Sequence, residues 1–78
     1  MPRYHFDIVD SSGFYPDDEG LELPDTRAAE IEAVGALAIV IRDATPEKQF
    51  ERMAIEVRIG EGRLFQVAVT FEVSRRTH

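Results

Sequence analysis

Two runs of alternating apolar and polar residues, joined by a short glycine-containing segment, constrain the fold of this chain more than any other feature. In the first run the apolar residues are Met53, Ile55, Val57 and Ile59. In the second run they are Phe65, Val67, Val69, Phe71 and Val73. Alternation with a period of two is the pattern of half-buried β-strands. Two such runs separated by residues 60–63 therefore predict an antiparallel β-hairpin.

The beginning of the chain predicts a second, less regular hairpin. Residues 3–10 alternate, and they place Tyr4, Phe6 and Ile8 on one face of a strand. Residues 10–13 are turn formers, and a short return strand follows at residues 14–15. Pro16 interrupts that strand because proline cannot donate to a β-ladder. Residues 20–23 are expected to resume an extended conformation briefly.

Between the two hairpins, residues 27–44 have the periodicity of an α-helix. Asp25 or Thr26 is expected to cap its N-terminus by accepting a hydrogen bond from a free backbone N–H. Pro46 disfavours continuation of the helix through the residue before it. The order of elements predicts an α+β, ββαββ fold, a four-stranded antiparallel sheet with one helix packed on one face. The strand residues expected to meet the helix are Tyr4, Phe6, Ile8, Ile55, Val57, Val67, Val69 and Phe71.

The helix has more apolar surface than one sheet can cover. Its predicted core face consists of Ala29, Ala33, Ala36, Leu37, Val40 and Ala44. A second apolar line consists of Ile31, Val34, Ala38 and Ile41, at spacings typical of a helix–helix seam. We expect this line to form a homodimer, helix against helix about a two-fold axis. The alternative is that residues 45–51, with Phe50 and Met53, or the first loop of the chain, fold over it.

Length and composition exclude several classes of protein. With 78 residues, the chain is expected to form a single domain over residues 1–78, frayed at 1–2 and 75–78. It has no cysteine, so neither a disulfide nor a thiolate metal site is available. A net charge of −6 makes nucleic acid an unlikely partner, because such binding depends on neutralising phosphates. The longest apolar stretch, residues 33–41, is too short to span a membrane, and we expect a cytoplasmic protein.

No motif in the sequence predicts catalysis, a cofactor site or a metal site. His5 and Asp7 share one strand face and could form an acid–base pair, but a surface contact between strands explains them more simply. The acidic residues Asp17, Asp18, Glu19 and Glu22 lack the spacing of a calcium loop, and we expect a solvated loop. The glycines of residues 60–62 lie in a turn and not between a strand and a helix, so they do not predict a dinucleotide site. We therefore expect a protein that is not an enzyme and needs no cofactor.

Three segments together resemble a known family. These are residues 2–7, residues 17–25 with the alanine-rich helix that follows, and residues 54–58 with the terminal hairpin. The combination resembles small bacterial proteins of unknown function, mainly alphaproteobacterial, of about this length. The resemblance implies a stand-alone domain and supplies no activity. With the second helical line, it leads us to expect a non-catalytic homo-oligomeric interaction module.

A looser resemblance concerns the HicB-type antitoxins, which also place a short hairpin before an alanine-rich helix. It implies an alternative function, a regulator that binds a protein toxin or operator DNA, on the likeness of fold alone.

Overall fold

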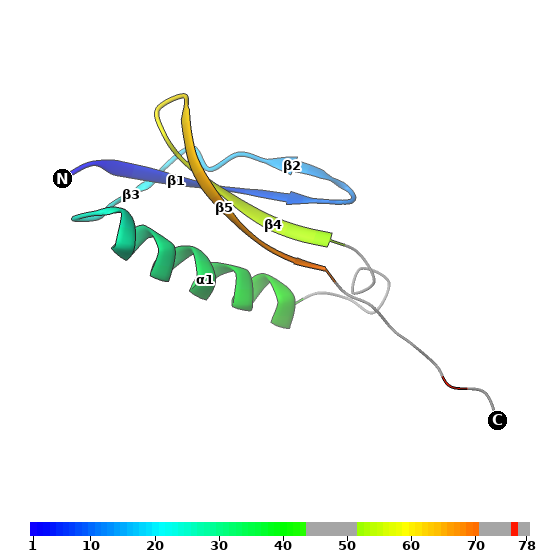
Figure 1. The fold of residues 1–78 in the computed structure, drawn as a ribbon. Helices are drawn as coiled ribbons and strands as arrows, with labels where there is room; N and C mark the ends of the chain where they lie inside the picture. Colours follow the sequence, from blue (N-terminus) through cyan, green and yellow to red (C-terminus); the bar gives the residue numbers. More distant parts are fainter. Residues whose placement is uncertain (44–51, 71–75, 77–78) are drawn as a thin grey trace.

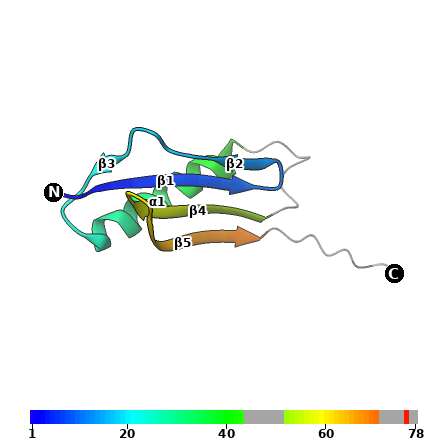
Figure 2. The same ribbon diagram turned by 90° about the horizontal axis from the view of Figure 1, so that it is seen from above.

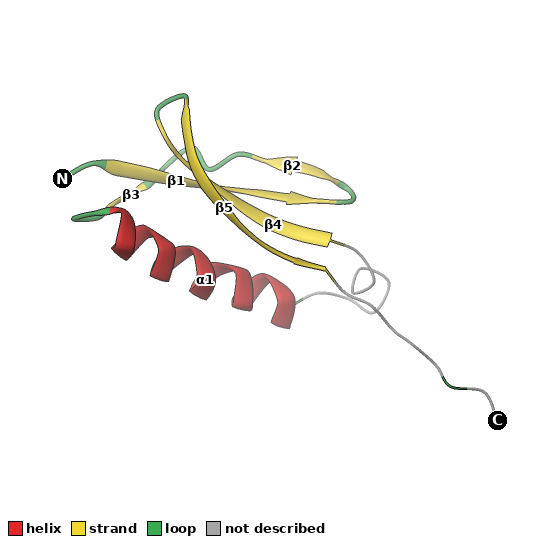
Figure 3. Cartoon of the chain, in the orientation of Figure 1, coloured by secondary structure: helices red, strands yellow, loops and turns green. Residues whose placement is uncertain are grey.

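The computed structural model describes residues 1–43, 52–70 and 76, in which one helix lies along one side of an antiparallel sheet (Figure 1). The elements in chain order are β1 (Arg3–Asp10), β2 (Gly13–Tyr15), β3 (Leu21–Glu22), α1 (Thr26–Arg42), β4 (Arg52–Ile59) and β5 (Gly62–Thr70). The α+β class and the antiparallel sheet are confirmed (Figure 3). The two-residue β3 is an additional strand where the sequence predicts only a brief extended segment.

The two hairpins join edge to edge at the centre of the sheet. The strand order is β2-β1-β4-β5, and β3 pairs with the other half of the β1 edge. Phe6 lies opposite Val57, Ile8 lies opposite Ile55, and Ile55 in turn lies opposite Val67. Partners directly opposite one another project to the same face, so this register aligns the apolar residues of three strands on one side.

Short polar residues and glycine fix the turns. Asp10 accepts hydrogen bonds from the backbone N–H groups of Ser12 and Gly13, at 2.8 and 3.0 Å. This side-chain mimic of a backbone turn directs β2 back along β1. Between β4 and β5, Gly60 has a φ of +58°, a conformation that hairpin turns favour at glycine.

The helix begins where the sequence predicts it. Asp25 is the N-cap, and its side chain accepts a hydrogen bond from the Ala28 N–H at 2.8 Å. The last helical residue is Arg42, and the Asp43 N–H closes the final turn on the Ile39 carbonyl at 3.1 Å. None of the helices in the described residues is long and apolar enough to cross a membrane.

The hydrophobic core lies between α1 and the central strands. Its buried cluster consists of Tyr4, Ala29, Ala33, Leu37, Met53, Ile55 and Val57. The partly buried side chains packed against it are Phe6, Ile8, Leu23, Ala36, Val40, Ile41, Phe65, Val67 and Val69. The predicted core faces of helix and sheet are thus confirmed, except that Ala44 and Phe71 lie outside the described residues. The small alanines let the helix lie close to the sheet.

Candidate functional site

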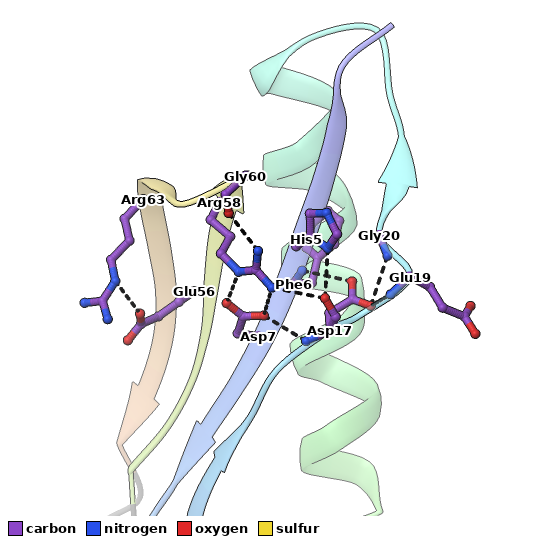
Figure 4. Close-up of polar contacts among 10 residues, drawn as sticks. All are labelled: His5, Phe6, Asp7, Asp17, Glu19, Gly20, Glu56, Arg58, Gly60 and Arg63. Atoms are coloured by element: carbon purple, nitrogen blue, oxygen red, sulfur yellow. Dashed lines mark hydrogen bonds and ion pairs between the residues drawn. The ribbon is translucent and has the colours of Figure 1, made fainter.

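The sheet face opposite the core has a cluster of charged side chains (Figure 4). Asp7 comes from β1, Arg58 from β4, and Asp17 from the loop between β2 and β3. Asp7 and Arg58 occupy strand positions that alternate with the core residues Phe6 and Val57. Alternation therefore directs both side chains away from the helix.

Asp7 and Arg58 form a buried ion pair. Arg58 Nε donates to Asp7 Oδ2 at 2.7 Å, and Arg58 Nη2 donates to Asp7 Oδ1 at 3.3 Å. The Asp7 side chain is only 4% exposed, whereas that of Arg58 is 25% exposed. Two parallel bonds between a guanidinium and a carboxylate form the strongest kind of ion pair in proteins. The pair locks β1 to β4 on the side of the sheet that the helix does not cover.

The remaining donors of Arg58 reach two loops. Nη2 donates to the Asp17 carbonyl at 3.2 Å, and Nη1 donates to the Gly60 carbonyl at 2.7 Å. Asp17 in turn donates its backbone N–H to Asp7 Oδ1 at 2.8 Å. One guanidinium thus joins the β2–β3 loop, the β1 strand and the β4–β5 turn.

The Asp17 carboxylate takes the place of a missing strand. Between β2 and β3, the edge of β1 has no strand beside it, and the Phe6 N–H there donates to Asp17 Oδ2 at 3.1 Å. Asp17 Oδ1 accepts from the N–H groups of Glu19 and Gly20, both at 3.1 Å. A backbone N–H that would otherwise lose its partner is satisfied, and the loop is tied down at the same time.

His5 and Gly20 complete this arrangement. His5 Nδ1 lies 2.8 Å from the Asp17 carbonyl, which can only accept, so Nδ1 carries the proton. Gly20 has a φ of +74°, and a Cβ built there would lie 2.8 Å from Arg3 Cγ and 2.9 Å from His5 Cε1. Only glycine fits at this position, because the loop passes directly over β1 in a left-handed conformation.

The hydrogen bonds keep both carboxylates ionised. Burial acts to raise the pKa of Asp7, but the hydrogen bonds from Arg58 and the Asp17 N–H outweigh it, and the pKa lies below its ordinary value. Burial likewise opposes ionisation of Asp17, and the N–H groups of Gly20, Phe6 and Glu19 lower its pKa. The hydrogen bond to Asp7 raises the pKa of Arg58. These hydrogen bonds therefore favour the charged forms of all three side chains, and we call Asp7, Asp17 and Arg58 the clasp.

All three clasp residues lie within the segment, residues 3–70, that a family model matches. The chain belongs to the DUF6894 family. The description of this family is a domain of unknown function, which agrees with the resemblance to a family of unknown function. No curated protein and no solved structure is similar enough to this chain to match.

The clasp corrects two interpretations of the sequence. His5 and Asp7 do not form a surface pair in this DUF6894 domain, because Asp7 is buried against Arg58 and His5 contacts the Asp17 carbonyl. Asp17 is not part of a merely solvated loop, because its carboxylate accepts three backbone hydrogen bonds. Strand alternation places Asp7 and Arg58 on one face, and that signal could have indicated the ion pair.

In the described residues of this DUF6894 domain, no three side chains of histidine, aspartate or glutamate gather as metal ligands would. Asp17, the first acidic residue of the loop, directs its carboxylate oxygens to backbone N–H groups. The charges of the clasp thus have partners within the fold.

The second apolar line of the helix is largely exposed. Ile31 is 62% exposed, Val34 is 57% exposed, and Ala38 is also exposed. Ile41 differs from the prediction, because it is partly buried and packs against the core. It follows Leu37 by four residues, which places it on the side of the helix that meets the sheet. We call Ile31, Val34 and Ala38 the outer surface of α1.

The alternative in which neighbouring residues cover this line loses one of its two side chains. Met53 is 3% exposed and belongs to the core. Phe50 lies outside the described residues.

Proposed function

We propose that this DUF6894 domain is a non-catalytic module that self-associates as a homodimer through the outer surface of α1. The observation that carries the proposal is the exposure of Ile31 and Val34, side by side on one helix. Adjacent exposed apolar side chains on a small domain mark a surface for contact with another protein.

Gly35 supports the same surface. A glycine inside a helix costs about 1 kcal/mol relative to alanine. A Cβ built at Gly35 would meet no atom within 4 Å, so the fold of the single chain does not require glycine there. A second helix that approaches closely would supply the missing reason, since small residues allow short distances between helix axes.

The clasp supports a role without catalysis. A general acid or base must exchange its proton with a substrate. Asp7 and Asp17 instead accept hydrogen bonds from Arg58 and from backbone N–H groups, and these bonds favour their charged forms. The charged side chains of the clasp are thus used to hold the loops of the domain in place.

Two variants and the wild type, measured by light scattering after size exclusion, test the proposal. Ile31→Glu with Val34→Glu should give a folded monomer, because two charges cannot be buried at a helix–helix contact without a partner. Ile39→Glu is the matched control, since Ile39 is 52% exposed on the same helix but lies off the predicted line. The control should remain a dimer. A double variant that stays dimeric, or a wild type that is monomeric, would contradict the proposal.

A further inference from the structure

One long edge of the sheet has no strand beside it within the residues that the structure describes. β5 pairs with β4 on one side, and its other side forms the border of the sheet (Figure 2). A free edge presents unpaired backbone donors and acceptors that can pair with another strand.

The alternation of backbone direction shows which groups lie on this edge. The Phe6 N–H points to the outer edge of β1, so the residues on either side of Phe6 direct their backbone groups to β4. By the same alternation, Ile55 on β4 directs its backbone groups away from β1 and toward β5. Ile55 therefore exchanges hydrogen bonds with its partner Val67. Gln66 and Ala68 therefore direct their N–H and C=O groups to the free edge.

Burial of the core falls off toward β5. On β4, Ile55 is 1% exposed and Val57 is fully buried. Their partners on β5, Val67 and Phe65, are only partly buried although they lie on the same face. The core is therefore open along β5, where a further strand with apolar side chains would close it.

The edge also lacks the usual protection against pairing. Proteins protect exposed edges with lysine, proline or inward-pointing charges. Between residues 62 and 70 there is no lysine or proline, and Arg63 is the sole charged residue. Arg63 Nε lies 3.5 Å from Glu56 Oε1, on the neighbouring strand and away from the middle of β5.

We propose that β5 pairs in antiparallel fashion with β5 of a second copy, about a two-fold axis perpendicular to the sheet. This inference rests on the proposed self-association and specifies its geometry. Such an axis keeps both helices on one face of a continuous sheet. It also places Phe65, Val67 and Val69 on the same face as their counterparts, because residues directly opposite share a face. The strand thus complements itself.

The size of a stable interface favours this arrangement. A standard interface buries roughly 800 Å² on each partner and involves about 20–30 residues a side. Three side chains on α1 fall well short of that. The N-terminal part of α1 lies on the β5 side of the sheet, and its C-terminal end lies on the β1–β2 side (Figure 2). Ile31 lies in the N-terminal half of α1 and Val34 at its middle, so β5 and this part of the outer surface of α1 can meet the same partner.

Amide hydrogen exchange on the wild-type chain tests the pairing. In the dimer, the Gln66 and Ala68 amides should exchange at least about tenfold more slowly than in the dilute monomer, because each gains a hydrogen bond. The Val67 amide, already bonded to β4, serves as the internal control and should change little. Gln66 and Ala68 amides that exchange equally fast in dimer and monomer would overturn the inference.

A proline variant provides a second test. Ala68→Pro removes a donor that points to the free edge, a place where proline is tolerated in a sheet. It should raise the dimer dissociation constant at least about tenfold, since symmetry removes two hydrogen bonds at once. Ala68→Thr keeps the N–H and should leave the constant within about threefold. A proline variant that is folded and dimerises like the wild type would refute pairing through β5.

These outcomes separate the two proposals. A wild type that is monomeric at every concentration contradicts self-association itself. A dimer that depends on Ile31 and Val34 but leaves the β5 amides unprotected contradicts only the strand pairing.

Discussion

The two long edges of the sheet are treated in opposite ways. On the β1 side, β2 and β3 each cover part of the edge, and the Asp17 carboxylate bonds the N–H left between them. On the β5 side, the structure describes nine residues of strand with no partner beyond β4. One edge is closed by charge and hydrogen bonds, and the other is open and apolar.

This difference shows where a small domain places its limited stabilising contacts. A chain of 78 residues has a small core and leaves much of its surface exposed. The clasp places partly buried charges near the β1 edge, where no strand lies between β2 and β3. The open edge leaves core side chains only partly buried, which a partner subunit could correct. We therefore regard the closed edge as important for folding and the open edge as important for association.

The largest effect should come from breaking the closed edge at Asp7. Asp7→Ala leaves Arg58 without its buried partner and should lower the free energy of unfolding by about 2–3 kcal/mol. Urea denaturation measures this loss. Asp18→Ala in the same loop is the control, since Asp18 is exposed and should change stability by less than about 0.5 kcal/mol. Equal effects of the two substitutions would show that the clasp does not stabilise the domain.

Acid should weaken the closed edge. The pKa values of Asp7 and Asp17 are lowered in the folded state, so their contribution to stability is complete above the unfolded pKa of about 4. It should be lost as the pH falls from there through the lower folded values. Urea midpoints across this range measure the effect. The Asp7→Asn variant should show a shallower decline, and an identical decline would contradict our assignment.

The loop over β1 should tolerate no side chain at Gly20. Gly20→Ala forces a Cβ to within 2.8 Å of Arg3 Cγ at a φ of +74°. The cost should be about 1–2 kcal/mol in the free energy of unfolding, the penalty of a left-handed conformation. Urea denaturation checks the value, and an unchanged stability would mean that the loop adopts another path.

The smallest effect should be an increase in the free energy of unfolding, whereas the preceding substitutions lower it. Gly35→Ala adds a methyl group where nothing lies within 4 Å, so it should stabilise the folded monomer by up to about 1 kcal/mol. The same change should weaken the dimer, because the added group lies beside the outer surface of α1. Unfolding of dilute protein measures the stability of the monomer, and the dissociation constant of the dimer measures the association. A stabilised monomer with unchanged association would show that Gly35 does not lie at the interface.

Much of the fold could be predicted because its signals are local. Alternation identified the strands around Phe6, Ile55 and Val67, and the Asp25 cap marked the start of the helix. Spacing in the helix also separated the buried Ala33 from the exposed Ile31.

Alternation could have placed Asp7 and Arg58 on one face, but the complete clasp could not be predicted, because the path of the chain through space brings its parts together. Asp17 reaches Phe6 over eleven residues of chain, through a loop whose course no periodicity describes. Arg58 bonds Asp7 diagonally across two strands that are fifty-one residues apart. Ile41 was misplaced for a related reason, because a position at the border of two helix faces is decided by tertiary packing.

Sedimentation equilibrium of the wild-type chain over a range of micromolar concentrations tests our central claim, self-association, most directly. We expect the mass to rise from the monomer value of 8.8 kDa to twice that value as concentration increases. A mass that stays at 8.8 kDa throughout the range would contradict the claim.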